Sequence, residues 1–182
     1  IGSASRTTAL RVLQAHGLGL QDIIEQELSI SSALLALQKE ETDAVFQVIG
    51  TPADSVRDSL MEMPLRMLPM SKDALSKLTE AKTGYFPYMI AKGTYSGQSQ
   101  DIQTIATAAL LLTDTAFSDA EIASLTRRIF EKGHDYSALG SAQGAQISVQ
   151  TSRLGLSIPM HTTAARTLES MSSAAQTPEK QL

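Results

Sequence analysis

Short apolar runs alternate with capped helices along the first half of the chain, and this alternation limits the fold more than any other feature. Residues 43–50, DAVFQVIG, are apolar, rich in branched and aromatic side chains and closed by glycine, which is typical of a strand. A helical pattern over 31–41 precedes this run, and a looser apolar-polar alternation over 23–28 precedes the helix. Strand, helix and strand in this order predict a parallel unit and therefore an α/β fold.

Capping residues and glycines mark the other elements. Ser3 or Ser5 can cap a first helix that Gly17 ends, and Ser118 with Glu121 three residues later forms a capping box. Further helices are expected from Thr51 with Pro52 in its first turn, over 71–81, over 118–133 with Gly133 as the stop, and over 161–171. Strands are expected over 65–70 and, as a pair, within 85–97 and 101–114.

The first turn of the chain's first helix is a candidate anion site. A helix N-terminus presents unbonded N–H groups and the positive end of the helix dipole, and Ser3, Ser5 and Thr7 surround it with hydroxyl groups. Arg6 could add a bidentate clamp on a carboxylate or phosphate. An ordinary serine cap with Arg6 in solvent explains the same residues, and their position alone does not decide between the two interpretations.

A second strand-to-helix turn supports the first. Gly50, Thr51 and Pro52 follow an apolar run and precede a helical pattern, so in a parallel sheet both turns open at the same edge, where α/β proteins bind ligands. Tyr95 is a further candidate ligand contact, because Gly93 and Gly97 on either side of it open the backbone. A tight turn and an aromatic packing residue are the alternative explanations.

Several classes of function are disfavoured by what the sequence lacks. A formal net charge of -4 with interspersed signs provides no basic stripe for nucleic acid. There is no cysteine, and the three histidines lack metal-ligand spacing, so we expect no metal site. Neither a nucleophile elbow, nor H-E-x-x-H, nor a phosphate or dinucleotide loop occurs, so we expect no cofactor and no enzyme. No apolar run approaches the roughly 20 residues of a membrane span.

Four motifs follow one another along the chain: GSASRTTALRVLQAHGL, QKEETDAVFQVIGTPADSV, KGTYSGQSQDIQT over 92–104 and IPMHTTAARTLES. In sequence and in order, they resemble the later part of the TAXI family of solute-binding receptors that serve TRAP transporters, and KGTYSGQSQDIQT is the most specific of them. Gly2-Ser3-Ala4-Ser5 stands where the family commonly has glycine-serine-glycine-threonine. The resemblance covers the chain up to Met171.

The resemblance implies a periplasmic receptor of the class II binding-protein fold, in which two lobes close on a small carboxylate-bearing solute such as an amino acid or a dicarboxylate. The receptor would hand this solute to the membrane permease subunits of a TRAP transporter. Arg6 would be the charge partner, the N–H groups after Ser3 and Ser5 the anion nest, and Gly50 to Pro52 the facing wall. A small-molecule sensing domain of a regulator, with the same fold, is the alternative.

The resemblance also implies an incomplete receptor. The chain starts without Met or a basic, apolar leader, and Ile1-Gly2 has the pattern of the end of a strand, so we expect a fragment or processed product that lacks the N-terminal portion. Residues 3–92 would form the second lobe, 93–171 the crossover strands and the C-terminal helices that complete the first lobe, and 172–182 a disordered tail. Apolar surface exposed by the truncation would favour a homodimer or a swapped arrangement.

Overall fold

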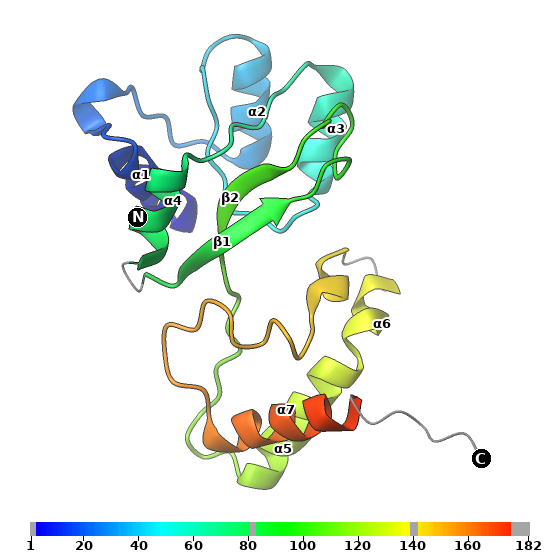
Figure 1. Ribbon diagram of the computed structural model, residues 1–182. Coiled ribbons are helices and arrows are strands. Elements are labelled where there is room, and N and C mark those ends of the chain that lie inside the picture. The colour runs from blue at the N-terminus through cyan, green and yellow to red at the C-terminus, as the bar shows by residue number, and fades with distance from the viewer. Residues whose placement is uncertain (1–2, 81–82, 139–141, 176–182) are drawn as a thin grey trace. The chain divides into compact units, whose positions relative to one another are not determined.

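The computed structural model describes residues 3–80, 83–138 and 142–175, and the chain divides into two compact units, Ile1–Ala106 and Thr107–Leu182 (Figure 1). The elements of the first unit are α1 (Ala4–Ala15), a short 3-10 helix (Leu20–Asp22), α2 (Ile30–Gln38), α3 (Asp54–Glu62), α4 (Lys72–Glu80), β1 (Tyr85–Ile90) and β2 (Ile102–Thr107). The second unit contains α5 (Asp119–Glu131), α6 (Gly133–Ala138), a 3-10 helix (Ala142–Gln146) and α7 (Thr162–Ala175). The chain is thus a mixed α/β protein.

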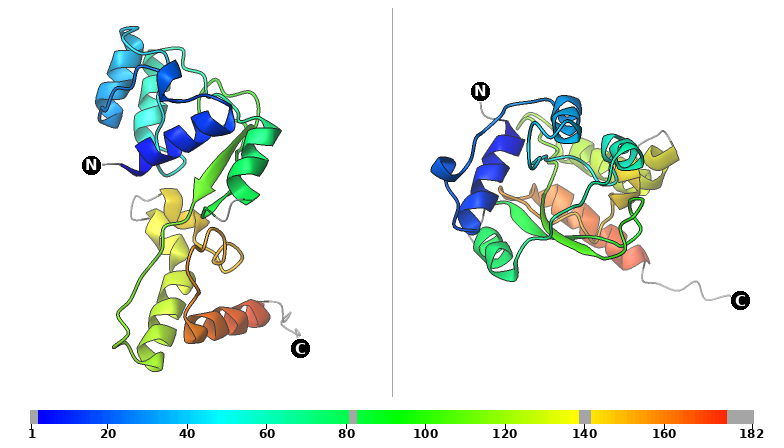
Figure 2. Two further views of the ribbon diagram at one scale, coloured as in Figure 1. Left: turned by 90° about the vertical axis from the view of Figure 1, so that its left-hand side faces the viewer. Right: turned by 90° about the horizontal axis from the view of Figure 1, so that it is seen from above.

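In the first unit, α4 packs against both α1 and β1, as Figures 1 and 2 show. Ala74 and Leu78 lie on the buried face of α4. Polar contacts reinforce the packing of α1, because the hydroxyl groups of Thr8 and Tyr85 share a hydrogen bond of 2.8 Å. The guanidinium carbon of Arg11 lies 5.6 Å from the centre of the Tyr85 ring, a cation-π distance. The first helix is therefore anchored to β1 as well as to α4.

The sheet is smaller than the sequence predicts. β1 and β2 pair, as expected for the runs within 85–97 and 101–114, and in the described residues they form a two-stranded sheet. The strands expected over 23–28, 43–50 and 65–70 are wrong: these segments carry no assigned strand. A strand needs a neighbour whose backbone it can pair with. Among the described residues, the one backbone hydrogen bond from these segments to β1 or β2 is from Met70 N to Gln103 O, at 2.9 Å.

Local capping predictions are mostly confirmed. The Ser3 side chain accepts a hydrogen bond from Arg6 N at 3.1 Å, and Gly17, with φ of 81°, follows the end of α1. The capping box of Ser118 and Glu121 begins α5. Thr51 as a cap is wrong, because α3 starts two residues later, with Ala53 at the N-cap position and no side-chain cap. Gly133 begins α6 instead of ending the helical region, because Lys132 already terminates α5.

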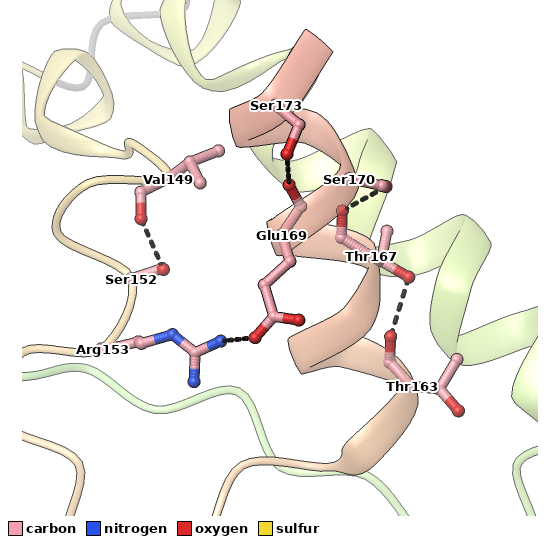
Figure 3. Close-up of polar contacts among 8 residues, drawn as sticks. All are labelled: Val149, Ser152, Arg153, Thr163, Thr167, Glu169, Ser170 and Ser173. Carbon is pink, nitrogen blue, oxygen red and sulfur yellow. Dashed lines mark hydrogen bonds and ion pairs between the residues drawn. The ribbon is translucent and has the colours of Figure 1, made fainter. Parts of the chain in front are cut away.

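The second unit is held by the packing of α5 against α7. Thr163 Oγ1 donates a hydrogen bond of 2.6 Å to Asp119 Oδ1, which joins the first turns of the two helices. On another side of α7, Arg153 Nη2 lies 2.9 Å from Glu169 Oε1 and ties the preceding loop to the helix (Figure 3). Leu168 on α7 and Ile122 on α5 are both buried apolar residues of this unit.

The chain divides into its two compact units between Ala106 and Thr107, because β2 pairs with β1 and so stays with the first unit. The lobes expected over 3–92 and 93–171 stay predictions. The tail expected over 172–182 is helical as far as Ala175, where α7 ends, and the rest of it lies outside the described residues. Within the described ranges, no helix combines the length and the apolar character that crossing a membrane requires.

Candidate functional site

Two hydrogen bonds bring the predicted site segments together in the first unit. Ser5 Oγ, in the first turn of α1, accepts a hydrogen bond from Val48 N at 3.0 Å. Tyr95 Oη accepts one from Ala53 N, also at 3.0 Å. The segment 48–53, called here the 48–53 loop, is thus held at its first residue by α1 and at its last residue by the connection between β1 and β2. Gly50, Thr51 and Pro52 lie between these two anchor points.

The first turn of α1 retains two N–H groups without an internal partner. Ser3 accepts two hydrogen bonds, from Arg6 N at its side chain and from Thr7 N at its carbonyl oxygen, at 3.1 Å each. The N–H groups of Ala4 and Ser5 have no hydrogen-bond partner in the described part of the chain. Free N–H groups at the positive end of a helix dipole can bind an anionic oxygen.

Arg6 already holds a carboxylate. Its Nε lies 2.5 Å from Glu25 Oε1 and its Nη2 lies 2.9 Å from Glu25 Oε2, a bidentate pair, and Glu27 Oε1 is 3.6 Å from the same Nε. The hydrogen bonding and the charge of Glu25 raise the pKa of Arg6 above its ordinary value. About a third of each side chain of this pair is exposed, so solvent and solutes reach it. The geometry shows that this guanidinium can bind both oxygens of a carboxylate at once, through Nε and Nη2.

The other predicted site residues differ in their surroundings. Tyr95 is buried, with 4% of its surface exposed, and its hydroxyl group contacts backbone and not solvent. Thr7 and Gly50 are exposed, whereas Thr51 and Pro52 are half-buried and joined by a cis peptide bond. The structure thus gathers Ser5, the 48–53 loop and Tyr95, and it pairs Arg6 with Glu25.

Sequence reasoning missed Glu25 and Gln98. Glu25 lies 19 residues from Arg6, in the segment 23–28 whose pattern predicts a strand, and nothing in that pattern indicates the ion pair. The side chain of Gln98 is hydrogen-bonded to the backbone of the connection between β1 and β2, which carries Tyr95. The sequence indicates this role only through the position of Gln98 directly after Gly97, which adopts a positive φ of 77°. Among the described residues, no group of three or more histidine, cysteine, aspartate or glutamate side chains is arranged to hold a metal ion.

One protein-family model matches almost the whole chain. The model of the NMT1-like family, a family of periplasmic-binding type, matches residues 1–170. The match includes every residue of the candidate site, from Ser3 at the N-cap of α1 to Tyr95 before β2. A mixed α/β structure with a small sheet is consistent with a periplasmic-binding-like fold. With a match of this extent, the chain belongs to the NMT1-like family.

Proposed function

We propose that the chain is a periplasmic solute-binding protein that captures a small carboxylate-bearing solute for a TRAP-type transporter, and that it binds its solute without chemical change. The family is of periplasmic-binding type, which supports a binding function. The observation that carries the site is the first turn of α1, where two unpartnered N–H groups lie one and two residues before a carboxylate-binding arginine. Burial of a solute carboxylate requires donors of this kind.

The charges beside Arg6 favour an amino acid over a dicarboxylate. Glu25 and Glu27 both lie within 4 Å of the guanidinium, so the three side chains together carry one negative charge when ionised. A second carboxylate on the solute would be repelled by the excess acid, whereas the ammonium group of a zwitterion would be attracted to it. The proposal is therefore a neutral amino acid whose carboxylate meets the α1 N-terminus and Arg6.

Glu25 acts in this scheme as an internal competitor for Arg6. Its carboxylate occupies Nε and Nη2, the same atoms that a solute carboxylate would use. The segment 23–28 that carries Glu25 makes no backbone-to-backbone hydrogen bond in the described chain. Displacing the Glu25 side chain therefore does not require any such bond to break. Removing the charge of Glu25 should release Arg6 for the solute.

Titration calorimetry of the full chain with L-alanine, L-glutamine and succinate tests the proposal. We expect at least one amino acid to bind more tightly than succinate. Glu25→Gln should raise the affinity for this amino acid several-fold. Arg6→Lys keeps the charge but loses the planar two-point contact with a carboxylate, and should lower the affinity at least tenfold. Glu41→Gln changes the net charge as Glu25→Gln does, at an exposed position with no ion pair among the described residues, and should leave affinity unchanged.

Two results would contradict this proposal. If none of the three solutes binds the wild-type chain, the small-carboxylate assignment is wrong. If an amino acid binds but Arg6→Lys leaves its affinity unchanged, Arg6 is a structural residue that pairs with Glu25. Delivery to a permease is tested separately, by loss of uptake of the bound solute in a bacterial strain that lacks the gene and its recovery when the gene is restored.

A further inference from the structure

We propose that Gln98 is a positioning residue for the candidate site and that it sets the conformation of the 48–53 loop through Tyr95. This inference rests on the proposed function as far as solute binding is concerned. It assigns to Tyr95 a role different from direct ligand contact, because the hydroxyl group of Tyr95 is already hydrogen-bonded to the backbone of that loop.

The side-chain amide of Gln98 joins both ends of the connection between β1 and β2. Its Nε2 donates to Ile90 O at 3.1 Å, Ala91 O at 3.0 Å and Gln100 O at 2.9 Å, which are carbonyl groups before and after the turn. Its Oε1 accepts from Tyr95 N at 3.3 Å. An amide NH₂ has two hydrogens, so three acceptors require one hydrogen to be shared. The donors and acceptors around this side chain therefore fix which way the amide points.

The backbone of the same connection closes around Gln98. Gly93 N donates to Gln98 O at 3.0 Å, and Gln98 N donates to Tyr95 O at 3.2 Å. Gly93 and Gly97 both have φ of 77°, a conformation that a residue with a Cβ atom rarely adopts, so the turn on each side of Tyr95 depends on glycine. Asp101 Oδ1 accepts from Lys92 N at 2.8 Å and closes the base of the connection.

Tyr95 transmits this geometry to the candidate site. Its side chain is buried, and its hydroxyl oxygen meets the N–H of Ala53, a residue that is itself 5% exposed. Ala53 follows Pro52 directly and is the N-cap residue of α3, so its position determines where the 48–53 loop ends. A buried N–H group that loses its acceptor is costly, and the loop would have to move to satisfy it. Gln98, Tyr95 and Ala53 thus form one chain of contacts that ends at the site.

Amide hydrogen exchange of the full chain, with residue-level readout by NMR, tests the positioning role without any solute. In Gln98→Ala we expect the amide groups of Gly93 and Ala53 to exchange at least tenfold faster than in the wild type. In Tyr95→Phe, which keeps the ring but removes the hydroxyl acceptor, we expect faster exchange at Ala53 with Gly93 unchanged. This order of effects differs from general destabilisation of the first unit, which would also accelerate exchange at the Lys39 amide, hydrogen-bonded to Leu35 O at the end of α2.

Gln100→Ala is the matched control, because Gln100 lies in the same connection and its exposed side chain has no hydrogen-bond partner among the described residues. Gln100→Ala should leave the amide groups of Gly93 and Ala53 as protected as in the wild type. Calorimetry with the amino acid that binds the wild type should show at least fivefold weaker affinity in Gln98→Ala at unchanged stoichiometry.

The two ideas fail in different ways. Equal protection of Ala53 in Gln98→Ala, Tyr95→Phe and the wild type would overturn the positioning role. The expected exchange pattern together with no solute binding by the wild type would overturn the proposed function and leave the positioning of the loop in place. The expected exchange pattern with unchanged affinity in Gln98→Ala would show that the 48–53 loop is not part of the solute site.

Discussion

Ser5 shows how one hydroxyl group can connect distant parts of the first unit. Its Oγ accepts a hydrogen bond from Val48 N, 43 residues away, in a half-buried position. In Ser5→Ala this N–H loses its partner, and we expect the free energy of unfolding to fall by about 1–2 kcal/mol. Urea denaturation of the full chain measures the change. Ser76→Ala, on an exposed face of α4 with no side-chain hydrogen bond in the described structure, should change stability by under about 0.5 kcal/mol.

If the loss of stability in Ser5→Ala is as small as that in Ser76→Ala, the Val48 N–H is hydrogen-bonded to water instead.

Hydrogen bonds within one turn of helix can be predicted from the sequence, whereas those between distant segments cannot. The caps at Ser3 and Ser118 are predictable because each bonds an N–H three residues later. The partners of Ser5 and Arg6 are not, because they depend on how the chain folds back on itself. Thr51 failed as a cap because the helix starts beyond Pro52, at Asp54.

The start of α5 carries a pH-sensitive element. Glu121 Oε2 accepts hydrogen bonds from the Ser118 hydroxyl at 2.6 Å and from Ser118 N at 2.8 Å, and these bonds lower the pKa of Glu121. A carboxylate with a lowered folded-state pKa stabilises the folded chain fully above its unfolded-state pKa, and this contribution is lost as pH falls through the folded-state pKa. Acidification should therefore weaken the beginning of α5.

Glu121→Gln tests this element, because glutamine is neutral at every pH but can still accept a hydrogen bond. We expect the variant to be less stable than the wild type at neutral pH, because a charge at the helix N-terminus is lost, and the difference to shrink as pH falls to about 3. Urea midpoints over this range measure it. Glu131→Gln, at the other end of α5, should not reduce the pH dependence in this way. A constant gap between Glu121→Gln and the wild type at all pH values would contradict the assignment.

At the scale of elements, helices are better predicted than strands for a physical reason. A helix satisfies its backbone within one segment, so the caps and apolar spacing of α1, α4, α5 and α7 were sufficient to locate them. A strand satisfies its backbone through a neighbour, so the pattern of residues 43–50 indicates only that a strand would fit there. The pair found in the described residues, β1 with β2, lies close in sequence and is joined by the connection that Gln98 organises.

For the molecule as a whole, the described residues include few large apolar side chains that are buried. The buried apolar residues in the described chain are Leu34, Ala36, Ala53, Ala74, Leu78, Tyr95, Ile122 and Leu168, and three of the eight are alanines. Meanwhile Leu111 and Leu112 are 64% and 67% exposed and Ile24 is 94% exposed. Stability of about 5–15 kcal/mol is usual for a domain, so each buried leucine here contributes a large share of the total.

Leu168→Ala and Leu112→Ala compare a buried with an exposed leucine of the second unit. Leu168, in the helix that packs on α5, is 3% exposed, and its truncation should cost about 2–5 kcal/mol through lost contacts and the cavity left behind. Leu112 is 67% exposed, and its truncation should cost under about 0.5 kcal/mol. Urea denaturation followed by circular dichroism measures both. Equal losses would show that Leu112 is covered in solution by a contact such as a second copy of the chain, and dilution would then destabilise the wild type but not Leu112→Ala.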